Sequence, residues 1–264
     1  MLWRLKEATL TVGNGTLDYA AFGNGKQPLV ILPGLSLRDV RGAGAGLAWM
    51  YRIFARKYRV YVLDKKEDIP ERYTVRDLAE DTAEAMKQLG LAEACVIGIS
   101  LGGMIAQYLA IEHPELVSRL VLGVTASRTN ETMEKTIGKW IDHAERDDFG
   151  GIVRGMAEQM YSERYVKRYG WLFPLLAKAG TPKNKQRFIR LACACLNCDT
   201  YAGLDRIQCP TLVLGGGRDR IVTAQASTEI AERLACPIHL YENLGHAAYE
   251  EARDFNRRIY DFLE

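Results

Sequence analysis

Apolar runs and amphipathic segments alternate along most of the chain. Four nearly unbroken apolar runs, at residues 28–35, 59–64, 94–99 and 119–124, are typical of strands buried on both faces of a sheet. Residues 74–89 have the apolar spacing of an amphipathic helix, and a similar pattern follows the third run. Strands that alternate with helices predict a parallel sheet covered on both faces.

The two ends of the chain complete this pattern. Residues 7–22 alternate around a Gly-Asn-Gly turn, which predicts an antiparallel hairpin. Near the C-terminus, strand-like runs at 211–214 and 238–241 alternate with helix-like segments at 223–234 and 249–263. The sheet is therefore expected to have about eight strands.

Residues 127–206 interrupt the alternation, because helix-like segments follow one another there without a convincing strand. We therefore expect a helical cap inserted after the sixth strand, and an α/β core made of residues 1–126 and 207–264. The predicted fold class is α/β, with a mostly parallel, twisted sheet flanked by helices.

The composition is that of a globular protein with a large core, since 48% of the 264 residues are hydrophobic and 26% are charged. The net charge is only +2 and no long run of one sign occurs, so neither nucleic acid nor a membrane is expected as a partner. The first residues lack the apolar core of a signal peptide, and no stretch approaches the ~20 apolar residues of a membrane span. We expect a cytoplasmic monomer or homodimer.

The run 94–99 leads into Gly98-Ile99-Ser100-Leu101-Gly102, and a helix-like segment leaves on the other side. A serine between glycines at a strand-to-helix turn is the context of a nucleophile elbow, whose tight turn requires small neighbouring residues. The Ser100 hydroxyl would lie at a helix N-terminus, where free backbone N–H groups favour developing negative charge. Such a serine is otherwise an ordinary N-cap, so the assignment depends on partners elsewhere in the chain.

A serine hydroxyl needs a base to take its proton and an acid to orient that base. Of the four histidines, His113 precedes a proline at a helix end, His143 lies in a charged helical stretch, and His239 lies inside the predicted last strand. His246 differs, because it follows that strand at the carboxyl edge, where parallel-sheet sites form. His246 is therefore the candidate base.

Asp219 is the candidate acid. It lies in the glycine-rich loop after the strand at 211–214, at the same edge of the sheet. The other loop that could supply the acid, at 125–130, holds no carboxylate. Taken alone, an aspartate between two arginines would be interpreted as a solvated surface group.

Two backbone N–H groups form the candidate oxyanion hole. One such donor comes from the residue after the nucleophile and the other from the loop after an earlier strand. Leu101 and Leu35 occupy these places, and Gly34 would let the backbone approach a substrate carbonyl. A Pro-Gly pair alone would indicate only a strand-ending turn.

These motifs together resemble the α/β-hydrolase fold family, most closely its cofactor-free branch of esterases, enol-lactonases and haloperoxidase-like enzymes. The resemblance rests on residues 33–35, 98–103, 216–219, 245–246 and Glu251, in that order along the chain. It implies a site that needs neither cofactor nor metal, with Ser100 as nucleophile, His246 as base and then acid, Asp219 as its orienter, and Leu35 and Leu101 as oxyanion donors.

Two segments depart from the family's pattern. Pro33 stands where the family often has histidine before the oxyanion-loop glycine, so the support of that loop is expected to differ. Residues 64–70 are charged where the family usually shows a glycine-rich turn, and we interpret them as a surface loop. Neither departure touches the predicted triad.

The predicted cap is rich in aromatic residues and would offer an apolar or amphipathic pocket over the carboxyl edge. Its candidate substrate-binding residues are Trp140, Met160, Tyr161 and Trp171, although more than half of such residues are expected to pack against the core. We expect an uncharged or weakly charged ester or lactone as substrate. The basic run at 183–190 could instead hold a substrate carboxylate, but a solvated helix face is the usual explanation.

The six cysteines are expected to be reduced thiols. Cys193, Cys195 and Cys198, with Cys209 as a fourth ligand, suggest a metal site. On a helix, however, Cys193 and Cys195 point to nearly opposite sides. We therefore expect no metal site.

The sequence thus predicts a serine hydrolase that cleaves a small apolar or amphipathic carboxylic ester, lactone or thioester through an acyl-enzyme on Ser100. One alternative is different chemistry on the same triad, either acyl or peracid transfer or hydrolysis of a carbon–carbon bond. Another is a ligand-binding receptor with slow turnover. The serine nucleophile excludes the haloalkane dehalogenases and epoxide hydrolases of this fold, which use aspartate.

Overall fold

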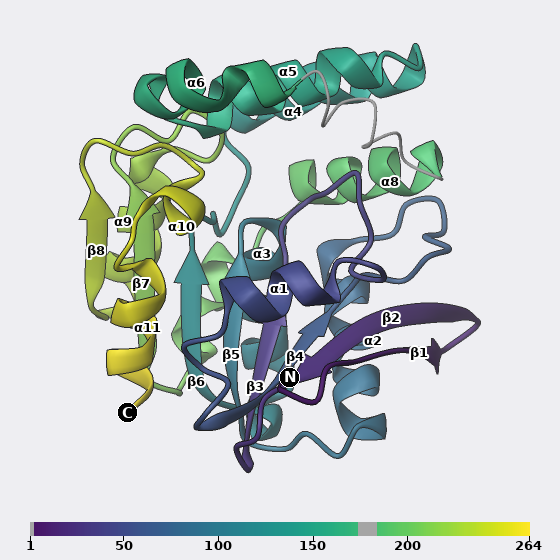
Figure 1. Ribbon diagram of the computed structural model, residues 1–264, viewed down its shortest axis with the longest axis vertical. Coiled ribbons are helices and arrows are strands. Elements are labelled where there is room, and N and C mark those ends of the chain that lie inside the picture. Colours follow the sequence, from purple (N-terminus) through teal and green to yellow (C-terminus); the bar gives the residue numbers. More distant parts are fainter. Residues whose placement is uncertain (1–2, 174–183) are drawn as a thin grey trace.

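A computed structural model of the chain describes residues 3–173 and 184–264. Its centre is an eight-stranded sheet in the order β1-β2-β4-β3-β5-β6-β7-β8, with helices on both faces (Figure 1). The strands are β1 (Lys6–Val12), β2 (Gly15–Phe22), β3 (Gln27–Leu32), β4 (Tyr58–Leu63), β5 (Ala94–Ile99), β6 (Val117–Gly123), β7 (Thr211–Gly216) and β8 (Ile238–Tyr241).

The pairing of the strands confirms the predicted fold class. β1 and β2 form the antiparallel hairpin, and β2 is also antiparallel to β4. All other neighbouring strands are parallel. Every residue of β5 and β7 is buried, as expected for apolar strands with helices on both sides.

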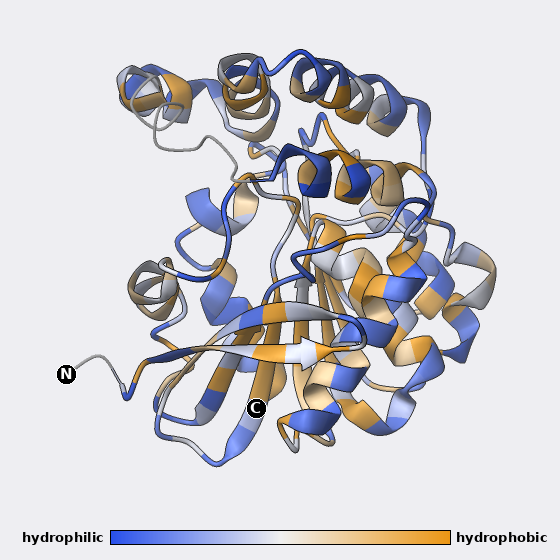
Figure 2. Cartoon of the chain, turned by 90° about the vertical axis from the view of Figure 1, so that its right-hand side faces the viewer, coloured by the Kyte–Doolittle hydropathy of each residue, from blue (hydrophilic) through white to orange (hydrophobic). Residues whose placement is uncertain are grey.

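Two hydrophobic cores lie on the two faces of the sheet. Buried residues of α2 (Val75–Gln88), α3 (Leu101–Glu112) and α9 (Ala224–Leu234) pack on one face, and those of α1 (Gly44–Met50) and α11 (Phe255–Leu263) pack on the other. Figure 2 shows the hydrophobic central strands between helices that carry both hydrophobic and hydrophilic residues. The core also contains the short helix α10 (Ala248–Glu251), which precedes α11.

The chain between β6 and β7 forms the helical insertion that the sequence predicted. We call its helices the cap, and α4, α5 and α6 lie across the carboxyl ends of the strands (Figure 1). The described parts of the cap are α4 (Glu131–Glu145), α5 (Phe149–Met160), α6 (Glu163–Tyr169) and α8 (Lys185–Leu196). Across residues 3–173 and 184–264, no helix has both the length and the apolar character that crossing a membrane requires.

The segment after β4 is a surface loop only in part, because residues 64–66 are buried whereas Asp68 and Pro70 are exposed. Asp64 and Lys65 are each 7% exposed, and Lys66 is 3% exposed. Arg187 of α8 donates to the Asp64 carboxylate at 2.9 Å, and the Lys66 ammonium group pairs with Asp81 of α2 at 2.9 Å. Charged side chains are rarely buried unless they are paired, and here both partners are distant in sequence.

The expectation of a solvated face for the basic run 183–190 is wrong at Arg187. This side chain is buried and contacts the chain after β4, not solvent. Lys183, the first residue of the run, lies outside the described residues.

Candidate active site

The turn between β5 and α3 has the geometry of a nucleophile elbow. Ser100 has φ of 54° and ψ of −119°, a conformation that L-residues rarely adopt. A Cβ atom at Gly98 would lie 2.5 Å from Gly102 O, and one at Gly102 would lie 1.9 Å from Leu32 O. Only glycine fits at these two positions, so the sequence folds into the turn that presents the Ser100 hydroxyl at the N-terminus of α3.

The three predicted triad residues meet at the carboxyl edge of the sheet. His246 Nε2 lies 2.9 Å from Ser100 Oγ, and His246 Nδ1 lies 2.8 Å from Asp219 Oδ2. Ser100 follows β5, Asp219 follows β7, and His246 follows β8. The three residues thus follow three parallel strands that end at the same edge of the sheet, with β6 lying between β5 and β7.

Asp219 is held in the ionised form. Burial by itself would raise its pKa, but the nearby His246 and its hydrogen bond, together with N–H groups of Ile221 and Val222, lower the pKa below its ordinary value. Those two N–H groups donate to Oδ1 at 2.8 and 3.0 Å, which leaves Oδ2 for the imidazole. With a carboxylate at Nδ1, His246 carries its proton there and Nε2 accepts the Ser100 hydroxyl proton.

The other three histidines make contacts outside the triad. His113 pairs with Glu80 and His143 pairs with Asp148, both at 2.9 Å. His239 packs edge-on against the ring of Tyr241, with 4.6 Å between ring centroids. Only His246 is placed to act on Ser100.

The proposed oxyanion donors lie next to the serine. Leu35 belongs to the loop after β3, and Leu101 is the first residue of α3. A Cβ atom at Gly34 would lie 3.2 Å from the Ser100 Cβ, so this loop runs directly beside the nucleophile. Among the described residues, neither the Leu35 N–H nor the Leu101 N–H has a hydrogen-bond acceptor, and both are available to an oxyanion.

Comparison with known proteins decides the family. The family model described as alpha/beta hydrolase fold matches residues 28–252. The chain belongs to the alpha/beta hydrolase fold family.

The relatives of this α/β hydrolase include enzymes of several activities. It is 23% identical to 3-oxoadipate enol-lactonase 2 of Acinetobacter baylyi, over 95% of this chain and 94% of that protein. It is 29% identical to pimeloyl-[acyl-carrier protein] methyl ester esterase of Neisseria meningitidis, over 66% of this chain and 70% of that protein. The solved enol-lactonase of Burkholderia xenovorans superposes with a TM-score of 0.85 at 20% identity, covering 97% of this chain and 99% of that one, and so has the same fold.

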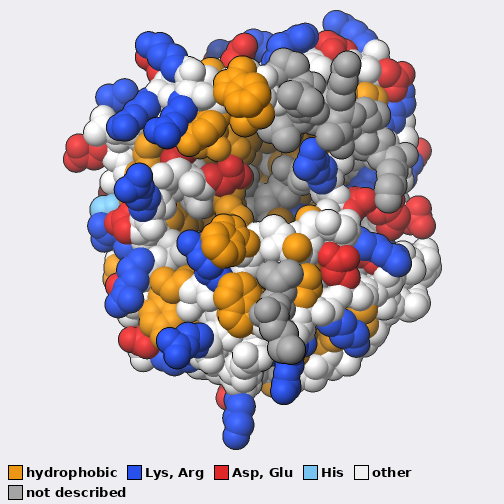
Figure 3. Space-filling view, viewed as in Figure 1, with side chains coloured by type: hydrophobic (Ala, Val, Ile, Leu, Met, Phe, Trp, Pro, Cys, Tyr) orange, Lys and Arg blue, Asp and Glu red, His pale blue; other side chains and the backbone are white. Residues whose placement is uncertain are grey.

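The hydrolase has a narrow pocket between Ser100 and the cap. The face drawn in Figure 3 is hollowed, and both hydrophobic and charged side chains border this outer hollow. The pocket has a free volume of about 30 Å³, which is room for about two water molecules. Its lining consists of Gly34, Leu35, Ser100, Met104, Ile137, Trp140, Met156, Met160, Cys195, Ile221, Val222, His246 and Tyr249.

Two of the four predicted substrate-binding residues line this pocket, and two do not. Trp140 and Met160 are part of the lining. Tyr161 instead donates to Glu250 at 2.6 Å and stacks on the ring of Tyr165, with 4.4 Å between centroids. Trp171 is 71% exposed. Aromatic content alone does not distinguish the pocket from the outer surface of a cap helix.

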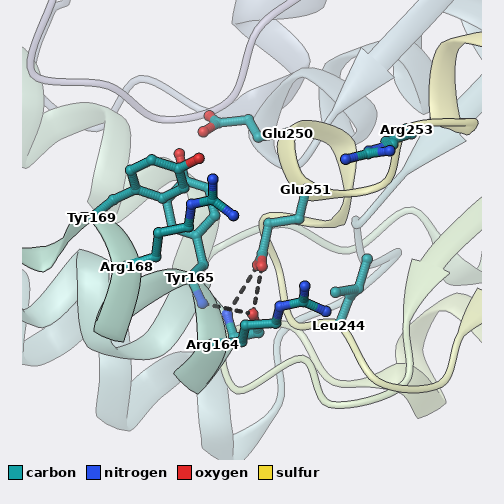
Figure 4. A pocket seen from close by; sticks show the side chains of 9 residues that line it. Arg164, Tyr165, Arg168, Tyr169, Leu244, Glu250, Glu251 and Arg253 are labelled. Carbon is teal, nitrogen blue, oxygen red and sulfur yellow. Dashed lines mark hydrogen bonds between the residues drawn. The ribbon is translucent and has the colours of Figure 1, made fainter.

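An outer groove marks the boundary between the cap and the core (Figure 4). Arg164 and Arg168 of α6 and Arg253 after α10 line it, together with Glu250 and Glu251. It lies outside the pocket that contains Ser100.

Several hydrogen bonds join the cap to the chain that follows β8, and we call three of them the histidine-side latch. Ser162 donates from its backbone N at 2.9 Å and from Oγ at 2.5 Å to the carboxylate of Glu251. The Ala247 N–H donates to Met160 O at 2.9 Å. Since Ala247 follows His246 directly, the latch links the position of the cap to that of the base.

All six cysteines are free thiols in the structure. Within the described parts of the chain, no three His, Cys, Asp or Glu side chains lie close enough together to hold a metal ion. Cys193 is exposed, whereas Cys195 and Cys198 are buried. Burial raises the pKa of Cys195 to about 12, so the thiol that lines the pocket is protonated at neutral pH and is a poor nucleophile.

Sequence reasoning missed several groups that hold the site. The Ile221 and Val222 N–H groups have no side-chain signature, because backbone geometry alone brings them to Asp219. Glu251 was noted as part of the family's pattern but was given no role. Lys65 was placed on the surface, although a charged run that directly follows a buried strand at the carboxyl edge is a signal for functional side chains.

Proposed function

We propose that this α/β hydrolase is a serine hydrolase that cleaves a small apolar or amphipathic carboxylic ester, lactone or thioester. The observation that carries the proposal is the continuous hydrogen-bond chain from Ser100 through His246 to Asp219. This arrangement is suited to acyl transfer to water, because it removes a proton from the serine and stabilises the imidazolium that results.

The reaction has two halves. Ser100 Oγ attacks the substrate carbonyl while His246 Nε2 takes the hydroxyl proton, and the N–H groups of Leu35 and Leu101 bind the oxyanion. The tetrahedral intermediate then expels the alcohol or thiol, which receives the proton from His246. In the second half, His246 deprotonates a water molecule that attacks the acyl-serine, and Ser100 recovers its proton as the acid leaves.

The lining of the pocket favours a substrate with an uncharged acyl group. Its lining is mostly aliphatic, aromatic or thioether in character, and among the described lining residues no lysine or arginine is present to pair with a substrate carboxylate. The names of two relatives, an enol-lactonase and a methyl ester esterase, favour lactones and esters over other acyl compounds. A requirement for an anionic acyl chain would contradict this part of the proposal.

Hydrolysis of p-nitrophenyl esters of increasing acyl length tests the proposal. We expect Ser100→Ala to lower turnover by a factor of about a thousand or more. Ser118→Ala, in β6, is the matched control and should retain turnover within about twofold. The proposal is wrong if the native protein neither hydrolyses any of these esters nor reacts covalently with a fluorophosphonate probe at Ser100.

A further inference from the structure

Lys65 contacts the loop that carries Leu35, whose N–H is one of the two proposed oxyanion donors. Its side chain leaves the end of β4 and its ammonium group donates to two successive carbonyls, Pro33 O at 2.5 Å and Gly34 O at 2.8 Å. The residue is 7% exposed. A buried ammonium group therefore makes charge-assisted hydrogen bonds to the backbone beside the nucleophile.

We propose that Lys65 is the positioning residue of the oxyanion hole, because it fixes the peptide between Gly34 and Leu35 with the Leu35 N–H directed toward the pocket. This inference rests on the serine hydrolase function proposed above. Lys65 itself does not touch the substrate, and it acts through the loop.

The geometry of one peptide unit links the lysine to the oxyanion. A trans peptide is planar, and its C=O and N–H point in opposite directions. Because the Gly34 carbonyl is held toward Lys65, the Leu35 N–H of the same peptide is held away from it, on the side where Gly34 packs against Ser100. Glycine could otherwise rotate this peptide at little cost, so an external anchor is needed.

The ammonium group also strengthens the donor. A positive charge at the carbonyl oxygen polarises the peptide, and hydrogen bonds in series reinforce one another in a buried site. The Leu35 N–H is thereby a better donor for a developing oxyanion than an ordinary backbone N–H.

A cap residue holds Lys65 in place. Arg187 of α8 donates to Lys65 O at 2.8 Å and to the Asp64 carboxylate at 2.9 Å. Asp64 also accepts from the Lys65 N–H at 2.8 Å. The buried Asp64–Arg187 pair thus fixes the backbone from which the lysine side chain extends.

Lys65 is poised to titrate just above neutral pH. Burial lowers its pKa to about 8, partly opposed by the charge of Asp64. The charged or titratable groups that face it are Asp64 on its own segment and Arg187 and Cys195 of α8; the Pro33–Gly34 loop contributes only carbonyls. The lysine is therefore mostly charged at pH 7 and loses its charge as the pH rises through about 8.

The two departures from the family's pattern then have one explanation. Pro33 stands where the resembled family often has a histidine, and the charged segment at 64–70 stands where that family usually shows a glycine-rich turn. The second change supplies, from a neighbouring strand, a side chain that holds the loop altered by the first.

The adjacent buried lysine provides a matched control. Lys65→Met removes the two hydrogen bonds to the loop, and we expect kcat on the preferred p-nitrophenyl ester to fall by about 10- to 100-fold with KM changed by less than about threefold. Lys66→Met removes an ion pair with Asp81 that does not touch the loop. It should lower stability but leave kcat within about twofold.

The pH profile distinguishes positioning from a merely structural role. In the native protein, kcat should fall between about pH 7 and about pH 9.5 as Lys65 loses its proton, and in Lys65→Met this fall should be absent. Lys65→Gln gives a second neutral variant with the same expectation. If neither variant folds, the native profile decides, and a flat kcat over this range overturns the proposal.

The outcomes separate this inference from the function on which it rests. A native protein that neither turns over esters nor reacts with a fluorophosphonate contradicts the hydrolase itself. An active native protein, with Lys65→Met reacting as fast as Lys66→Met, contradicts only the role of Lys65.

Discussion

The two sides of the active site are both attached to the cap, but by different chemistry. On the histidine side, Ser162 donates two hydrogen bonds to the half-buried carboxylate of Glu251. On the oxyanion side, Arg187 forms an ion pair with Asp64, and the side chains of both residues are only 7% exposed. One attachment lies at the rim of the molecule, and the other is in its interior.

This difference indicates which side is built to stay fixed. Breaking a buried ion pair leaves an uncompensated charge in a medium of low dielectric constant, whereas hydrogen bonds at the rim can be exchanged for water. The pocket must enlarge from about 30 Å³ to admit an ester. We therefore expect the cap to separate from the core on the histidine side while the oxyanion side remains in place.

The largest effect should come from breaking the oxyanion-side ion pair. Arg187→Met leaves Asp64 buried without its partner, and we expect the free energy of unfolding to fall by about 3–5 kcal/mol in urea titrations. Lys185 lies on the same helix as Arg187 and forms a more exposed pair with Asp147, so Lys185→Met should cost less than about 1 kcal/mol. Equal losses of unfolding free energy in the two variants would show that the buried pair contributes no more to stability than the exposed pair does.

A smaller loss is expected on the histidine side. Glu251→Gln removes the charge of the group that accepts both Ser162 hydrogen bonds. The free energy of unfolding should therefore fall by about 1–2 kcal/mol. Because Ala247 belongs to the same latch, kcat should fall as well, but by less than about tenfold. Glu242→Gln, an exposed substitution after β8, is the control and should stay within about 0.5 kcal/mol of the native protein. If Glu251→Gln lowered the free energy of unfolding as much as Arg187→Met does, the oxyanion-side attachment would not be the stronger of the two.

The same contrast explains how much the sequence could predict. Local patterns predict the sheet, the helical insertion and the positions of Ser100, Asp219 and His246. Apolar periodicity and turn residues can each be recognised within a short segment of the sequence. The burial of Lys65 could not be predicted this way, since its environment depends on Arg187, which is more than a hundred residues away in the chain. Likewise, aromatic residues suggested that Trp171 binds substrate, but only packing shows that it faces solvent.

The smallest effect is the coupling between the two sides, and it tests the comparison directly. The two attachments share no residue, so a double variant, Arg187→Met with Glu251→Gln, should lose the sum of the two single losses to within about 0.5 kcal/mol. Additivity means that the histidine side can open without disturbing the oxyanion side. A coupling above about 1 kcal/mol would mean that the cap moves as one rigid unit, and the oxyanion loop would then shift whenever a substrate enters.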